Sequence, residues 1–144
     1  MKNLILLLFI PLVFACSDEG VNNSEDVSVI GKWYAVKYEY YSNGVLDNID
    51  NIEEYEINGC RSYVEFNSDS SLEFATVFLD CSGFDGQTYG TWELINNSNT
   101  LRMSYNSGTF DWDIVTLDNN NLVLEIEECE GNDECFRTIM FYEK

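Results

Sequence analysis

From Ile30 onward the chain alternates between short apolar stretches and clusters of turn-forming residues. The stretches are rich in Val, Ile, Thr and aromatic residues, and Gly, Asn, Asp and Ser separate them. Breaks at roughly 8–12-residue spacing are typical of all-β sandwiches and barrels. The pattern predicts eight strands, at residues 32–41, 61–67, 72–79, 88–95, 100–105, 109–117, 122–128 and 136–142.

Several of these stretches alternate strictly between apolar and polar residues. Val64 and Phe66 flank Glu65, and Trp112 lies between Asp111 and Asp113. A period of two gives a strand one buried face and one wet face. The connections 67–70, 96–99, 106–108 and 118–121 are hairpin-sized, which indicates antiparallel neighbours. We therefore expect an eight-stranded antiparallel up-and-down β-barrel, because a closed barrel leaves no open edge.

The longest connection, residues 42–58, is polar and acidic. We expect a short helix within it, at residues 49–55. Residues 47–54 hold carboxylates and amides at alternating spacing, which is a pattern that can bind calcium. They lack the glycine and the distal glutamate of an EF-hand loop, so a solvated charge run is the favoured interpretation. We expect no metal and no cofactor.

The predicted inward face is bulky and apolar. An eight-stranded barrel can be filled by its own side chains or can hold one small ligand, and the sequence leaves both alternatives open. The side chains expected to point inward are Val64, Phe66, Phe74, Phe78, Met103, Tyr105, Phe110, Trp112 and Met140.

The N-terminus has the organisation of an export signal. Lys2 precedes an apolar run at residues 4–13, which is too short to span a bilayer. Ala15 and Cys16 follow and resemble the lipobox of bacterial lipoproteins, whose cysteine is acylated and becomes the new N-terminus. Ordinary secretory cleavage after Ala15 is the alternative, and it would leave Cys16 as a free thiol. We divide the chain into a signal at 1–15, a lipidated tether at 16–29 and a barrel domain at 30–144.

The tether carries the expectation about location. An aspartate directly after the lipidated cysteine would resemble an inner-membrane retention signal. Ser17 stands at that position instead, so we expect a lipid anchor in the outer membrane of a Gram-negative bacterium. The Asp18–Glu19 pair resembles surface-export signals of some Gram-negative groups. Whether the protein faces the periplasm or the exterior stays open.

Four cysteines remain once Cys16 is assigned to the lipid, an even number that suits an oxidising compartment. Three pairings are possible. We prefer Cys60–Cys81 with Cys129–Cys135, because each pair flanks a predicted hairpin. No C-x-x-C spacing and no histidine occur, which disfavours a zinc site.

Composition narrows the function classes. Without histidine, Ser-His-Asp and Cys-His catalysis are excluded, and no other activated nucleophile is evident, so we expect no enzyme. Seven basic and 26 acidic residues give a net charge of −19. Such a surface repels nucleic acid and anionic headgroups and attracts basic proteins. The apolar signal aside, we expect contact with the membrane only through the N-terminal lipid.

The first predicted strand opens with Gly31-Lys32-Trp33, and Gly90-Thr91-Trp92 opens a later one. This G-x-W opening resembles the lipocalin family, as found in bacterial lipocalin-like lipoproteins. The resemblance covers residues 30–142, although the chain is shorter than typical lipocalins. It implies an eight-stranded barrel that can hold a small hydrophobic molecule. It also implies that Gly31 and Trp33 are structural, with Trp33 packed across the closed end.

Two functions are consistent with these features. The first is a monomeric, lipid-anchored binding protein for a small hydrophobic molecule, with a mouth beside Tyr38, Tyr40 and the 42–58 connection. Its candidate ligand contacts are Tyr38, Tyr40, Phe66, Phe74, Met103 and Trp112. The alternative is a filled barrel whose acidic surface grips a basic protein, as in inhibitor-type lipoproteins directed at lysozyme.

The lipid anchor is directly testable. We expect Cys16→Ala to leave an uncleaved precursor or to release the protein from membranes, because the acylated side chain is lost. Detergent partitioning of both proteins, expressed in a Gram-negative host, measures this. Unchanged partitioning of the variant would contradict the assignment of Cys16.

Overall fold

The computed structural model describes residues 27–52, 60–77, 82–131 and 134–144. Nine β-strands form in this part of the chain. They are β1 (Gly31–Ser42), β2 (Val45–Asn51), β3 (Tyr63–Phe66), β4 (Ser71–Val77), β5 (Phe84–Ile95), β6 (Thr100–Tyr105), β7 (Gly108–Leu117), β8 (Asn121–Glu130) and β9 (Glu134–Glu143).

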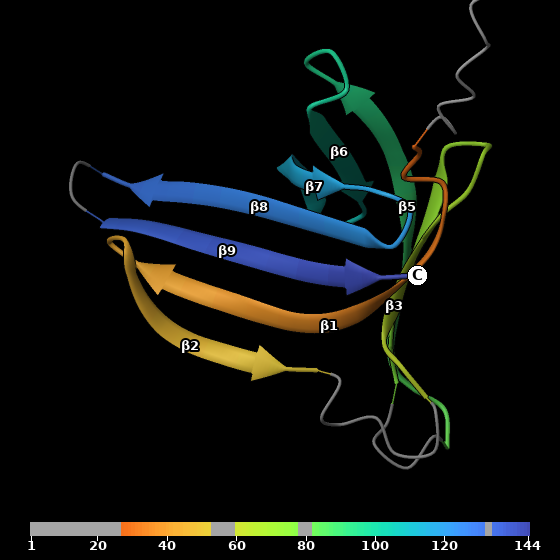
Figure 1. The fold of residues 1–144 in the computed structure, drawn as a ribbon, viewed down its shortest axis with the longest axis horizontal. Coiled ribbons are helices and arrows are strands. Elements are labelled where there is room, and N and C mark those ends of the chain that lie inside the picture. The colour runs from red at the N-terminus through yellow and green to blue at the C-terminus, as the bar shows by residue number, and fades with distance from the viewer. Residues whose placement is uncertain (1–26, 53–59, 78–81, 132–133) are drawn as a thin grey trace, which may run out of the picture.

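Eight of these strands form the closed antiparallel barrel that the sequence predicts. Neighbouring strands from β3 to β9 pair in chain order, β1 pairs with β3, and a β1–β9 pairing closes the ring. Figure 1 shows β8, β9 and β1 running side by side, with β3 running across at their right-hand ends. Every predicted strand is present, and the all-β class is confirmed.

The predicted helix at 49–55 is wrong where the structure can be compared. Ile49 to Asn51 belong to β2, which pairs with the C-terminal half of β1; residues 53–59 lie outside the described part of the chain. The hairpin turns at Asn43 and Gly44, whose φ values are +51° and +75°. An Asn-Gly pair favours a two-residue hairpin turn with both φ values positive. β1 is long enough to offer this ninth strand an edge beyond β3.

A β-bulge in β1 decides which side chains face inward. The β1–β9 register slips between Ala35 and Lys37, so Ala35 lies opposite Tyr142 and Tyr38 lies opposite Met140. A bulge places two residues of one strand against one of the other. Lys37 consequently points outward, where its Nζ lies 4.2 Å from the ring centroid of Phe141.

The closed end of the barrel is built around Trp33. This side chain is fully buried, and its Nε1 donates to the Val29 carbonyl oxygen at 2.6 Å. The Lys144 ammonium lies 4.6 Å from the ring centroid. Gly31, two residues earlier, has φ +124°, a backbone conformation that glycine adopts readily. Phe66 and Leu72 are also buried and belong to the same core.

The second G-x-W motif has a different requirement for its glycine. A Cβ atom at Gly90 would lie 2.3 Å from the Ser104 carbonyl oxygen of the neighbouring strand. Trp92 stacks edge-on against Phe66, with ring centroids 5.7 Å apart, and its Nε1 donates to the Asn67 carbonyl oxygen. Gly90 therefore allows β5 and β6 to approach closely.

One of the two preferred disulfides is confirmed. Cys129 and Cys135 are bonded across the β8–β9 hairpin. Cys60 is also disulfide-bonded, but Cys81 lies outside the described residues, so the Cys60–Cys81 pairing stays a prediction. Asn43 bonds to both the backbone N–H and the carbonyl oxygen of Cys135. The ends of the β1–β2 and β8–β9 hairpins are thereby tied together.

Residues 1–26, with the predicted signal, Cys16 and most of the tether, also lie outside the described part of the chain. None of the described segments forms a helix long and apolar enough to cross a membrane.

The burial of Trp33 generates a stability prediction. Trp33→Ala should lower the free energy of unfolding by about 3–5 kcal/mol, the usual cost of deleting a buried large aromatic side chain. A domain of this size has about 5–15 kcal/mol in total. Thermal and urea unfolding would measure the loss, with the half-buried Trp92→Phe as a milder comparison. A melting temperature that barely moves would show that Trp33 does not hold the closed end together.

Candidate functional site

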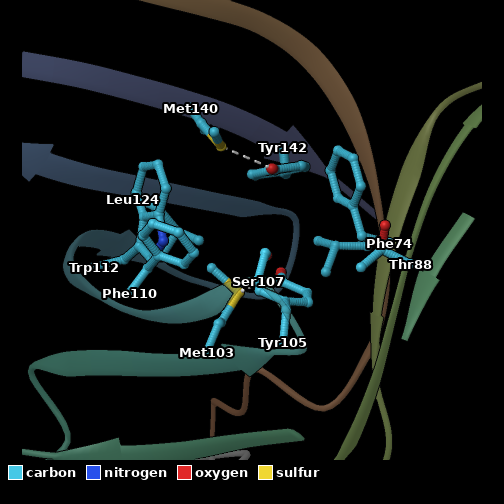
Figure 2. Close-up of a pocket in the computed structure, with 11 residues that line it drawn as sticks. Phe74, Thr88, Met103, Tyr105, Ser107, Phe110, Trp112, Leu124, Met140 and Tyr142 are labelled. Carbon is cyan, nitrogen blue, oxygen red and sulfur yellow. Dashed lines mark hydrogen bonds between the residues drawn. The ribbon is translucent and has the colours of Figure 1, made fainter. Parts of the chain in front are cut away.

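The barrel interior contains a cavity of about 300 Å³ that is open to one side. Most of its wall is apolar, and Figure 2 shows the side chains converging on it from several strands. Ligand pockets range from about 300 to 1,000 Å³, so this cavity suits a small molecule. The lining residues are Val64, Phe74, Thr88, Met103, Tyr105, Ser107, Phe110, Trp112, Leu124, Met140 and Tyr142.

Strand pairing places these residues on one continuous inner surface. Val64 lies opposite Phe74, Met103 opposite Phe110, and Leu124 opposite Met140. Directly paired residues point to the same face of a sheet, so each pair contributes a row to the wall. With Thr88 of β5, the cavity wall draws on seven strands, β3 to β9.

The structure brings three of the six predicted ligand contacts to the cavity. Phe74, Met103 and Trp112 line it. Phe66 is buried in the core at the closed end, against Trp92, and is not part of the wall.

The two tyrosines expected at the mouth do not line the cavity. Tyr38 and Tyr40 are on the inner face of β1, opposite Met140 and Thr138. Tyr38 packs against the buried core beside Tyr142, with ring centroids 6.2 Å apart. Neither side chain is among the residues that line the cavity, although Tyr38 adjoins two that do.

Most of the remaining wall was already expected to face inward. Val64, Tyr105, Phe110 and Met140 line the cavity as inward-facing residues, while Phe78 lies outside the described part of the chain. The expected inward set did not include Thr88, Ser107, Leu124 or Tyr142. Leu124 and Tyr142 follow the period-two pattern of their strands, so alternation could have found them. Thr88 and Ser107 carry no such signal.

The polar atoms near the cavity are mainly phenol hydroxyls. Tyr142 Oη donates to Met140 Sδ at 3.1 Å, and Tyr105 Oη donates to Met103 Sδ at 3.5 Å. Burial raises the pKa of Tyr105 to about 12. Burial also raises the pKa of Tyr142 well above its ordinary value, and it raises the pKa of Tyr38. These phenols therefore keep their protons near neutral pH.

Among the described residues, no charged side chain lines the cavity. Apart from Lys2, the basic residues all lie on outward faces or at the closed end, where each contacts a carboxylate or an aromatic ring. Arg102, for example, donates to both carboxylate oxygens of Asp111, at 2.7 and 2.8 Å. The others are Lys32, Lys37, Arg61, Arg137 and Lys144.

The cavity therefore favours binding over bond chemistry. Its wall offers dispersion contacts and a few hydroxyl groups, with no acid–base pair among the lining residues. Within the described segments, no three Cys, Asp or Glu side chains converge on a position that could hold a metal ion.

Comparisons with known proteins agree with this geometry. The sequence model of a family described as "Lipocalin-like domain" matches residues 29–124. No curated protein matches the chain. Among solved structures, apocrustacyanin C2 is similar, with a TM-score of 0.53, 15% identity, 85% of this chain covered and 64% of that chain covered.

Two structures of a bovine protein also match. Bovine odorant binding protein, as a deswapped triple mutant, gives a TM-score of 0.43 at 16% identity, covering 79% of this chain and 72% of that one. Its complex with a selenium-containing odorant gives 0.44 at 15% identity, with 79% and 68% covered. The chain thus spans less than two thirds of apocrustacyanin C2 and somewhat more of the bovine protein.

Proposed function

Because the chain belongs to the lipocalin-like domain family, we propose that its barrel binds a small hydrophobic molecule inside the cavity. The observation that carries this proposal is the open apolar cavity itself. A barrel filled by its own side chains would leave no such space. Phe74, Met103 and Trp112 would supply much of the apolar contact.

The proposal includes a lipid anchor on Cys16 and a place in the cell envelope, at the outer membrane of a Gram-negative bacterium. The support for this part is the export signal and the even number of cysteines that remain after Cys16. The Cys129–Cys135 disulfide is consistent with an oxidising compartment. A tethered barrel would hold its ligand close to the membrane surface.

Dye binding tests the cavity. The neutral dye N-phenyl-1-naphthylamine should bind one-to-one and gain fluorescence. Phe74→Trp and Met103→Trp should weaken this binding about tenfold or more, because overfilling a packed interior costs about 1–3 kcal/mol. Phe141→Trp is the matched control, since Phe141 points outward beneath Lys37. Binding should change little with salt, because the cavity wall, as far as the chain is described, holds no charged residue.

A folded protein that binds no dye would favour the second candidate, a protein-binding module. The observation behind this candidate is the turn end of the β8–β9 hairpin, where Glu127, Glu128, Glu130 and Glu134 are exposed. Four carboxylates at one projecting end suit a basic partner.

The second candidate makes an opposite salt prediction. Binding to a basic protein such as lysozyme should be lost between low and moderate ionic strength, because exposed charges are screened over about 8–10 Å. The double substitution Glu128→Gln and Glu130→Gln should also weaken binding to the basic protein, as measured by titration over the immobilised partner. Salt-independent binding, or binding unaffected by both substitutions, would reject the acidic hairpin as the interface.

A further inference from the structure

Two tyrosine hydroxyls at the cavity wall, and a third beside it, lack a good hydrogen-bond acceptor. Tyr142 and Tyr105 line the cavity, and the acceptors of their hydroxyls are thioether sulfurs. Tyr38 Oη is buried and has no hydrogen-bond partner among the described residues. We call Tyr38, Tyr105 and Tyr142 the phenol cluster.

The three hydroxyls belong to one neighbourhood. Tyr38 and Tyr142 lie on adjacent strands with tilted rings, and their centroids are 6.2 Å apart. After burial, the nearby Tyr38 and Tyr105 phenols contribute to the raised pKa of Tyr142. Tyr38 and Tyr142 are close enough to influence each other, yet the positions of their oxygens do not meet hydrogen-bond geometry.

Unused donors of this kind are unfavourable in a protein interior. A thioether is only a weak acceptor, and a buried hydroxyl without a partner costs free energy relative to one that is paired. When a ligand fills the cavity, a phenol hydroxyl at the wall loses any water bound to it. An oxygen atom on the ligand can then take the place of that water as the hydrogen-bond acceptor. The wall therefore favours an acceptor on the ligand.

The charge distribution indicates that this acceptor is uncharged. No lysine or arginine of the described segments lines the cavity, so a carboxylate would lose its hydration without gaining an ionic partner. Asp50 and Asn48 lie opposite Tyr38 and Tyr40 on the inner face of β2, and the Asp50 charge would oppose an anion further. An ammonium group has no lone pair with which to accept from a phenol.

We propose that the cavity is selective for neutral apolar molecules that carry one hydrogen-bond acceptor, such as an ester or ketone oxygen, and that Tyr105 and Tyr142, the cluster members that line the cavity, donate to it. This inference rests on the proposed ligand-binding function and narrows its ligand class. The ring bodies of the cluster contribute apolar surface, and the hydroxyls supply the selectivity.

Competition at pH 8 tests the ligand class. Methyl decanoate, decanoate and decylammonium carry alkyl chains of similar length. At pH 8 the ester is neutral, the acid is anionic and the amine is cationic, because carboxylic acids titrate near about 4.3 and primary amines near about 10.4. Methyl decanoate should displace N-phenyl-1-naphthylamine at a concentration at least about tenfold lower than either ion, because burying an unpaired charge is costly. Equal or better displacement by decanoate or decylammonium would overturn the proposal.

Substitution tests the donors. Replacing all three tyrosines of the phenol cluster with phenylalanine keeps the rings and removes the hydroxyls. Affinity for methyl decanoate should fall about fivefold or more, the usual effect of losing a hydrogen bond, while dye affinity stays within about twofold. Tyr34→Phe is the control, because Tyr34 points outward beneath Arg61. Should the triple variant not fold, Tyr105→Phe and Tyr142→Phe are measured singly.

The outcomes distinguish a failure of the ligand class from a failure of the cavity-binding function. If the folded protein binds no dye, the cavity-binding function fails and the ligand class fails with it. If the dye binds but the three probes compete equally, only the ligand class is wrong. If the ester is preferred and the tyrosine variants keep that preference, the phenol cluster is not the donor.

Discussion

The barrel depends on the backbone hydrogen bonds along both edges of β1. One edge pairs with β9 from Tyr34 to Ser42 and closes the ring, and the other pairs first with β3 and then with β2. An exposed strand edge can pair with another chain. Because both edges of β1 are paired within the molecule, β1 offers no such edge. The bulge at Val36 lies in this strand, between the half that belongs to the closed end and the half that faces the open side.

Charge is separated from the interior almost completely. Carboxylates and basic groups pair on the outer face, as Arg61 does with Glu143 at 2.6 Å, while the cavity wall is apolar with a few hydroxyls. The physical reason is that an ion loses far more hydration on burial than an apolar wall can return. The high net negative charge therefore influences which molecules approach the protein, and the apolar wall determines which of them stay bound. A phenol combines a large apolar ring with one polar tip, which suits such a wall.

Alternation along single strands carried most of the correct predictions. It placed all eight barrel strands, and it assigned Val64, Phe74, Met103 and Trp112 to the inner surface that the cavity uses. The ninth strand was missed because residues 42–58 are polar, although Asn43-Gly44 is a strong hairpin signal. Phe66 was grouped with the ligand contacts because alternation identifies a face but not a height along the barrel axis, and its height puts it in the closed end.

The sequence by itself determined the fold class, the strand faces and the exclusion of histidine chemistry, because these depend on local pattern and composition. The tertiary structure alone decided whether the interior is filled or open, since that depends on how side chains from seven strands meet. It also decided that Lys37 points out and Tyr38 in, because a bulge is defined only against a partner strand. The phenol cluster joins residues from β1, β6 and β9. Only barrel closure brings those strands around one space.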